Sequence, residues 1–419
     1  MVLRVGSIVL RAGCLAFVML MHVCGATTAF ADPTAAATNA KLTGDRHRTS
    51  FELDLSAGIP AEIYTLANPY RVVVDLPDVA FRLPDGTGQE GRGLVHAFRY
   101  GLFAEKKARV VLDTTGPVKI ERAAMTAASD GKGVKFTFDM VATDSISFGL
   151  GTGSGKAAEE PRPAEPPMLP DEKPKRSDNK SDKPVIMIDP GHGGVDSGAT
   201  SLSSMLEKDI VLAAGMELAR QLTATGRYDV QMTRTTDVFV SLDQRLGLST
   251  KHDVDLFISL HADSLSAENG AQVVRGATIY TLSERASDER SRRMAEKENA
   301  SDLIAGINVA DSEAENEVKS ILFDLMKRET ANFSADFSNA LLRKLKKQTA
   351  LAPEPQRSAA FKVLKQTHAP SVLVELGYLS NSEDEKLLTS AAWRKKTAAA
   401  ITSAVDTYFS KRTAGDTGP

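Results

Sequence analysis

The stretch that most constrains the fold is Val185–Gly198, which reads Val-Ile-Met-Ile-Asp-Pro-Gly-His-Gly-Gly-Val-Asp-Ser-Gly. Its first four residues form an apolar run, rich in β-branched side chains, that predicts a buried strand. The Asp-Pro-Gly that follows is expected to end this strand. His192 then lies on a glycine-rich loop at the carboxyl end of a strand, where open α/β sheets bind ligands. A phosphate-binding glycine loop, or a turn whose histidine has no chemical role, would show the same pattern.

Three later residues, like His192, are expected at the end of a strand or at the start of a helix. Glu207 opens a stretch with apolar residues at helical spacing, so it is expected in the first turn of a helix. His261 and Glu375 each close a short apolar run that predicts a buried strand. If these strands are parallel, the four side chains meet at one edge of a sheet. Two imidazoles and one carboxylate are a common ligand set of catalytic zinc, and the spare carboxylate can act as a general base.

The motifs around these residues resemble those of zinc-dependent N-acetylmuramoyl-L-alanine amidases of the periplasmic cell-division type, in that family's order and spacing. The resemblance covers about residues 183–409. It implies that His192, Glu207 and His261 bind zinc and that Glu375 is catalytic. One departure is Asp263, where the family more often has asparagine, but this is not a ligand position. The matching segments are Ile188–Gly194, Glu207–Val211, Thr233–Arg234 with Asp237 and Arg245, Phe257–Ala262 and Leu373–Gly377.

Two domains of different class are predicted. Over residues 184–410 strand patterns alternate with helix patterns, which predicts an α/β domain with a mainly parallel sheet flanked by helices. Residues 32–148, with a core at about 41–145, contain short alternating runs separated by turn signals, which predict a small all-β sandwich. This domain resembles the AMIN domain that precedes many periplasmic amidases and is linked to wall binding and septal placement. The segments that carry this resemblance are Tyr70–Pro77, Arg99–Gly101 and Arg109–Asp113.

The other segments are expected to lie outside these domains. Residues 1–31 have the basic start, short apolar core and small-residue cleavage motif of a secretory signal peptide. The apolar core is shorter than the roughly 20 residues of a membrane span, so no transmembrane anchor is expected after cleavage. Cys14 and Cys24 both lie in this segment, so zinc would be bound through nitrogen and oxygen alone. Residues 149–183 are expected to be a disordered linker rich in proline, glycine and lysine, and 411–419 a disordered tail.

A long polar stretch at about residues 283–330 interrupts the alternation of strands and helices. It could be an ordinary solvated, charged helix. In the cell-division amidases that this chain resembles, however, a helical insert at this place blocks the zinc site until a LytM-like activator displaces it. That resemblance makes Glu298 the first candidate for a carboxylate that takes a fourth zinc position and stops hydrolysis. Glu296 is the second candidate, on a different face of the helix.

The sequence therefore predicts a periplasmic zinc enzyme that cleaves the amide bond between N-acetylmuramic acid and L-alanine in peptidoglycan, at the division septum. The net charge of −3 implies no basic face and argues against a nucleic-acid-binding protein. Two rival functions remain: a non-catalytic wall-binding protein, and another zinc hydrolase of the wall, such as a peptidase or a sugar deacetylase. His252 and His368 precede predicted strands and are expected at the opposite edge of the sheet, outside the site.

Overall fold

The structure is a computed structural model. The predicted signal segment and nearly all of the predicted linker lie outside the residues that it describes. Within the described part of the chain, no helix has the combination of length and apolar character that crossing a membrane requires. The described residues are 33, 35–128, 131–149, 183–265, 274–307, 321–366 and 368–415.

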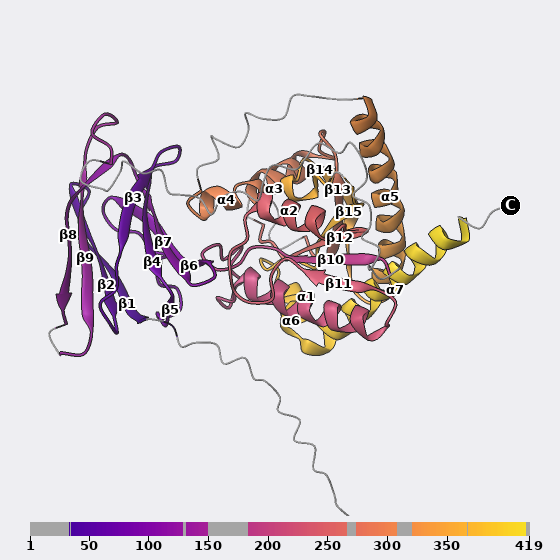
Figure 1. Cartoon of the computed structure of the whole chain (residues 1–419), viewed down its shortest axis with the longest axis horizontal. Helices are drawn as coiled ribbons and strands as arrows, with labels where there is room; N and C mark the ends of the chain where they lie inside the picture. The colour runs from indigo at the N-terminus through magenta and orange to yellow at the C-terminus, as the bar shows by residue number, and fades with distance from the viewer. Residues whose placement is uncertain are drawn as a thin grey trace, which may run out of the picture. The chain divides into compact units, whose positions relative to one another are not determined.

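The first domain is a sandwich of two β-sheets (Figure 1). One sheet has the strand order β5-β1-β2-β9-β8 and the other has the order β3-β4-β7-β6. Alternate residues of both sheets, such as Phe51, Val72, Leu112 and Phe138, meet in one apolar core, as expected for two sheets packed face to face. The predicted all-β sandwich is confirmed. Its strands are β1 (Ala35–Gly44), β2 (Arg48–Leu55), β3 (Glu62–Leu66), β4 (Arg71–Pro77), β5 (Val79–Phe81), β6 (Val95–Ala104), β7 (Lys107–Thr114), β8 (Val118–Ala127) and β9 (Val134–Ala142).

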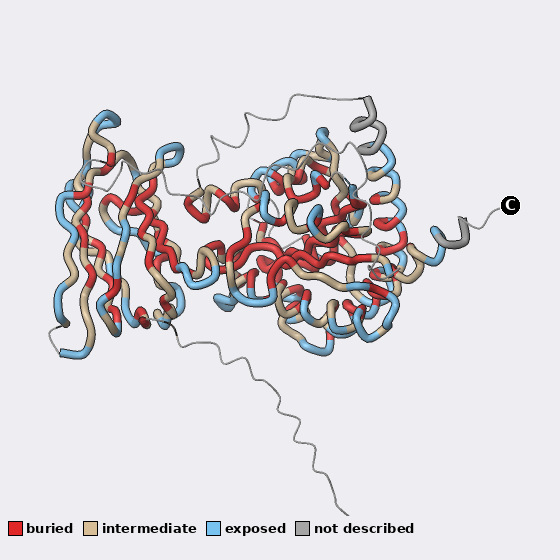
Figure 2. Tube along the Cα trace, viewed as in Figure 1, coloured by how far each residue is buried: buried red, intermediate tan, exposed pale blue. Residues whose placement is uncertain are grey.

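The second domain is built around a six-stranded sheet with the order β11-β10-β12-β15-β13-β14. Every neighbouring pair of strands is parallel except β13 and β15, which run antiparallel. Figure 2 shows that the strands at the centre of this sheet are buried. The predicted mainly parallel α/β domain is confirmed. Its strands are β10 (Val185–Pro190), β11 (Asp229–Met232), β12 (Leu256–His261), β13 (Ala277–Leu282), β14 (Leu351–Ala359) and β15 (Ser371–Glu375).

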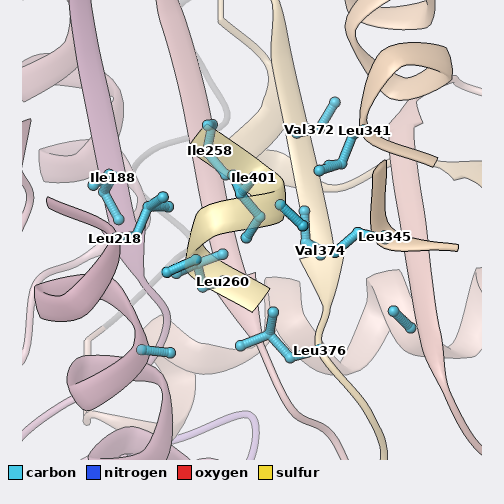
Figure 3. Close-up of a cluster of buried hydrophobic side chains, with 14 of the residues drawn as sticks. Ile188, Leu218, Ile258, Leu260, Leu341, Leu345, Val372, Val374, Leu376 and Ile401 are labelled. Carbon is cyan, nitrogen blue, oxygen red and sulfur yellow. The ribbon is translucent and has the colours of Figure 1, made fainter. Parts of the chain in front are cut away.

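Helices cover both faces of the six-stranded sheet. On one face, Leu218, Leu341 and Ile401 of α1, α5 and α7 pack against alternate strand residues (Figure 3). On the other face, Leu242 of α2 and Met294 of α3 belong to a second core. This division follows from the strand period of two, which sends successive side chains to opposite faces. The helices are α1 (Glu207–Ala224), α2 (Leu242–Lys251), α3 (Glu289–Asn299), α4 (Ser301–Ile304), α5 (Ile321–Leu345), η3 (Lys362–Leu364), α6 (Ser382–Thr389) and α7 (Ala391–Gly415).

Three element boundaries differ from the sequence predictions. β10 continues through Pro190, because that residue lies at the end of the strand, where a ladder N–H is dispensable. The helical pattern that closes the predicted α/β domain, over about Glu383 to Phe409, forms two helices and not one, since Ser390 between them has an extended backbone. The second of these, α7, ends at Gly415 and so includes the first five residues of the predicted tail.

Candidate active site

The carboxyl ends of the parallel strands β10, β12 and β15 lie at one edge of the sheet and carry the predicted site. His261 and Glu375, the last residues of β12 and β15, are directly paired across the two strands. His192 follows β10 on the loop that the sequence predicted. All three side chains are buried. The topology therefore brings these residues together, as their positions at strand ends indicate.

Glu207 reaches the same edge from the first residue of α1. Its Oε2 accepts a hydrogen bond from the Ala199 amide at 2.9 Å and its Oε1 accepts one from the Ala262 amide at 2.8 Å. The same two oxygens lie 3.2 Å from His192 Nε2 and 3.3 Å from His261 Nδ1, respectively. Backbone amides thus fix the carboxylate of Glu207 against both imidazoles.

Glu298 lies in the same place, although it comes from helix α3 of the insert. Its Oε2 is 3.3 Å from His192 Nε2 and 3.2 Å from His261 Nδ1. Its side chain is buried, whereas that of Glu296 is more than half exposed and pairs with Arg292. The structure therefore places Glu298, and not Glu296, between the two histidines.

The donor atoms at this point suit a metal ion. His192, His261 and Glu298 each bring one ligand atom within 4.8 Å of the others. Among the described residues, His192 Nε2 and His261 Nδ1 are buried without a hydrogen-bond partner. A tetrahedral zinc ion with bonds of about 2.0–2.1 Å separates neighbouring ligand atoms by about 3.3 Å, close to the spacings seen between the imidazoles and both carboxylates. The residues present therefore fit zinc with nitrogen and oxygen ligands.

The loop that carries His192 has an unusual backbone that its surroundings hold in place. His192 has a φ of 56°, in the left-handed region that side chains other than glycine rarely adopt. Arg245 Nη2 donates a hydrogen bond to the His192 carbonyl at 2.8 Å. Asp196 Oδ2 lies 2.9 Å from His192 Nδ1, so it orients the ring and leaves Nε2 facing Glu207 and Glu298. Strained residues of this kind persist where neighbouring groups fix them, which is common at active sites.

Beneath this loop lies a buried polar cluster centred on Asp189. Thr233 and Ser259 donate hydrogen bonds from their hydroxyls to Asp189 at 2.7 Å each, and Arg245 forms an ion pair with it. Arg234 donates to the carbonyls of residues 190 and 191. Sequence reasoning gave no role to Asp189 or Asp196. The signals available in the sequence were an acidic residue directly after the apolar run 185–188 and another acidic residue four positions after His192.

Glu375 has the environment of a proton acceptor. Burial raises its pKa well above the usual value, and the nearby carboxylates of Asp263, Glu207 and Glu298 raise it further. The Asp263 amide donates to Glu375 Oε2 at 3.0 Å, while Oε1 has no hydrogen-bond partner among the described residues. A free carboxylate oxygen with a raised pKa can accept a proton near neutral pH.

The ligand candidates have pKa values shifted in opposite directions. Burial opposes the charge of His192, but Asp196, Glu207 and Glu298 raise its pKa well above the usual value. Burial also opposes ionisation of Glu207, yet the two histidines hold its pKa well below the usual value. For Glu298 burial prevails over the histidines and raises the pKa. Glu207 is therefore the more firmly ionised of the two carboxylates.

The other two histidines in this domain lie outside the site, as predicted. His252 caps the carboxyl end of α2, four residues before β12 begins. His368 is exposed and precedes β15. Both positions are at the amino ends of strands, opposite the edge that carries His261.

Comparison with known protein families agrees with this geometry. The family model described as N-acetylmuramoyl-L-alanine amidase matches residues 186–407, more than half of the chain. The chain belongs to this amidase family. The model of the AMIN domain matches residues 39–138, within the β-sandwich.

Several amidases are similar to this member of the family. AmiC of Escherichia coli O6:H1 is 31% identical over 83% of this chain and 83% of its own length. AmiA of Escherichia coli K12 is 37% identical over 54% of this chain and 76% of its own. The solved structure of AmiC2 of Nostoc punctiforme covers 55% of this chain and 99% of its own, with 27% identity and a TM-score of 0.39. The family match and the similarity to AmiC and AmiA support a peptidoglycan amidase of the type that these two proteins represent.

Proposed function

We propose that this amidase is a zinc enzyme of the periplasm that cleaves the bond between N-acetylmuramic acid and L-alanine during septal wall splitting. The family, the AMIN domain and the four polar residues at one sheet edge support this proposal. His192, Glu207 and His261 would hold the zinc ion, with Asp196 orienting His192. Glu375 would be the catalytic base.

In this proposal the zinc ion activates the substrate and the water, and Glu375 transfers the proton. A bound zinc ion would polarise the amide carbonyl and lower the pKa of a water molecule. Glu375 Oε1 takes the proton of the attacking water as its oxygen bonds to the carbonyl carbon. Glu375 then delivers that proton to the nitrogen of L-alanine as the carbon–nitrogen bond breaks. The raised pKa of Glu375 suits the first transfer, because a carboxylate of ordinary pKa would be a weaker base toward the water.

We further propose that the enzyme is inhibited by its own insert, and the position of Glu298 is the observation that carries this idea. Its carboxylate contacts both histidines, where a fourth ligand would exclude the catalytic water. An activator of the LytM-like class would bind the insert better when α3 has left the site. Such differential binding shifts the population towards the open, active state.

Substitution of Glu298 tests the inhibition. Glu298→Ala should raise hydrolysis of dye-labelled peptidoglycan without an activator, while Glu296→Ala, two residues away and exposed, is the matched control. Mass spectrometry of the new termini should show free muramic acid lactyl groups and free L-alanine amines. Stem-peptide cleavage or glycan deacetylation would indicate one of the rival zinc hydrolases. A wild type that is fully active alone, with no gain in Glu298→Ala, would refute self-inhibition.

Metal analysis tests the zinc ligands separately. His261→Ala should lose most of its zinc, because it leaves His192 as the only nitrogen ligand beside the carboxylates. His252→Ala is the matched control, since that histidine lies at the other edge of the sheet. Full zinc occupancy in His261→Ala would remove His261 from the ligand set.

A further inference from the structure

Three arginines lie on the outer face of one sheet of the AMIN domain. In β4 and β7 alternate residues such as Val72 and Leu112 enter the sandwich core, so Arg71 and Arg109 point to the other face. Arg99 of β6 lies beside them. Although this is an outer face, Arg71 and Arg109 are only 1% and 3% exposed. Buried guanidinium groups are unfavourable unless they are paired, so these positions indicate a bound partner.

That partner is the carboxyl end of α4, in the insert. Arg71 donates to the Leu303 carbonyl, Arg99 Nε to the Ile304 carbonyl at 3.2 Å, and Arg109 Nη1 to the Ala305 carbonyl at 3.0 Å. The last carbonyls of a helix have no partner within it and carry partial negative charge. The three cations therefore complement this helix end.

The surface between the arginines also fits the segment in shape. Ala305 packs in one buried cluster with Val73 and Val111. Gly306 has a φ of 75°, and a Cβ there would approach these two valines at 3.2 and 3.3 Å. Arg109 is fixed for its role by Asp75, which accepts two hydrogen bonds from it at 2.6 and 2.8 Å. Charge and shape together indicate a built binding face.

The bound segment is directly connected to the candidate inhibitory residue. Ala300 is at once the last cap of α3 and the first cap of α4, so no loop separates the two helices. Glu298 thus lies only five residues before Leu303. Asp302 is held as well, because its Oδ1 accepts from the Leu242 amide at 2.9 Å. A displacement of residues 303–306 should therefore move Glu298 as well, because no flexible loop lies between them.

We propose that the AMIN domain clamps the inhibitory insert: Arg71, Arg99 and Arg109 bind the end of α4 and thereby hold Glu298 between His192 and His261. This clamp rests on the proposed self-inhibition. It gives the AMIN domain a regulatory role in addition to any wall binding. Breaking the three contacts releases α3 and opens the site.

Hydrogen exchange of the full chain tests the clamp directly. Arg71→Met and Arg99→Met should each speed exchange of amides in 289–306 by about tenfold or more, since losing a charge-assisted hydrogen bond shifts an equilibrium by roughly this factor. Basal wall hydrolysis should rise in parallel. Arg122→Met, an exposed arginine on β8 of the other sheet, should change neither quantity. Exchange of the sandwich strands, measured together, shows whether the AMIN domain remains folded.

A second variant approaches the contact from the insert. Gly306→Val should have the same two effects, because its side chain would meet Val73 and Val111, and it leaves the AMIN domain unaltered. Unchanged exchange in 289–306 for both the arginine variants and Gly306→Val would overturn the clamp. A rate increase in Glu298→Ala with none in the clamp variants would also overturn it, while self-inhibition stands. Faster exchange with no rate increase in any variant, including Glu298→Ala, would support the contact and refute the self-inhibition on which its role rests.

Discussion

Asp189→Asn is expected to destabilise the amidase domain strongly, although Asp189 does not face the proposed substrate. Asp189 is fully buried and forms an ion pair with Arg245. Burial would raise the Asp189 pKa, but the Arg245 charge and the hydroxyls of Thr233 and Ser259 hold it below its usual value. The carboxylate is therefore ionised, and the asparagine variant removes a charge while nearly preserving shape.

The size of the effect follows from what remains in the variant. Removing one partner of a buried ion pair typically costs about 3–5 kcal/mol, because the other charge stays buried. Arg245 still donates to the carbonyls of Pro190, His192 and Val240, so we expect the lower end, about 3 kcal/mol. Thr233→Val removes one hydrogen bond to the same carboxylate and should cost about 1.5 kcal/mol.

Urea denaturation followed by tryptophan fluorescence measures this loss in the amidase domain alone. The single tryptophan of the chain, Trp393, lies in the core of that domain. Asp406→Asn is the matched control, because Asp406 pairs with the largely exposed Arg227 and should cost no more than about 1 kcal/mol. A loss in Asp189→Asn no larger than that of the control would refute the argument that the buried pair supports this domain.

Three further predictions concern the base, the insert and the AMIN domain. Glu375→Gln should keep its zinc by metal analysis but lose about 100- to 10,000-fold in wall hydrolysis, and near-normal turnover would place the base elsewhere. Asp288 caps α3 and bonds to Arg357, and although burial opposes ionisation, these contacts lower its pKa to about 2. This pKa is below the value of about 3.9 that aspartate has in an unfolded chain. The contribution of Asp288 to the free energy of unfolding is therefore present above pH 4 and is lost as the pH falls towards 2. Asp288→Ala should therefore cost about 1 kcal/mol in urea denaturation at pH 7 and progressively less below pH 4; an equal cost throughout would contradict this. A chain starting at Lys183 should bind zinc yet sediment less with peptidoglycan, and undiminished sedimentation would give the AMIN domain another task.

The convergence of four site residues could be predicted because each lies at the end of a strongly patterned element. His192, His261 and Glu375 each follow a short apolar run, and parallel strands bring their carboxyl ends to one edge. Glu207 opens a helix with apolar residues at regular spacing. The local pattern and the tertiary arrangement agree here, so the sequence was sufficient to place these side chains, although not to assign their roles.

Where tertiary contacts override the local pattern, the sequence was insufficient. Glu296 and Glu298 are neighbours in a highly charged helix, and periodicity does not show that only Glu298 is buried. β14 escaped prediction because it contains Pro353 and Pro355, which disfavour strands; the sheet tolerates them because β14 is an edge strand. β1 consists mostly of alanine, threonine and other small or polar residues, so its pattern lacked large apolar side chains.

Asp263, the departure from the family's more common asparagine, is paired with the insert in this chain. Its carboxylate is buried, its negative charge helps to raise the Glu375 pKa, and it forms an ion pair with Lys297, the residue before Glu298. Lys297 can neutralise Asp263 only while α3 occupies the site. When α3 leaves, the buried charge of Asp263 loses its cation and still repels that of Glu375, which is unfavourable. The pair should therefore favour the closed state.

A double-mutant cycle in basal wall hydrolysis tests this coupling. Because the Lys297 side chain is 43% exposed, we expect only about 1 kcal/mol from the pair, or roughly a fivefold change in the open population. Lys297→Met should therefore raise the basal rate about fivefold in the wild type. In an Asp263→Asn background the same substitution should change it less than about twofold, since no buried charge is left to neutralise. Each ratio compares Lys297→Met with its own parent, so any direct effect of Asp263 on Glu375 cancels. Equal rate increases in the two backgrounds would show that the ion pair does not hold α3 closed.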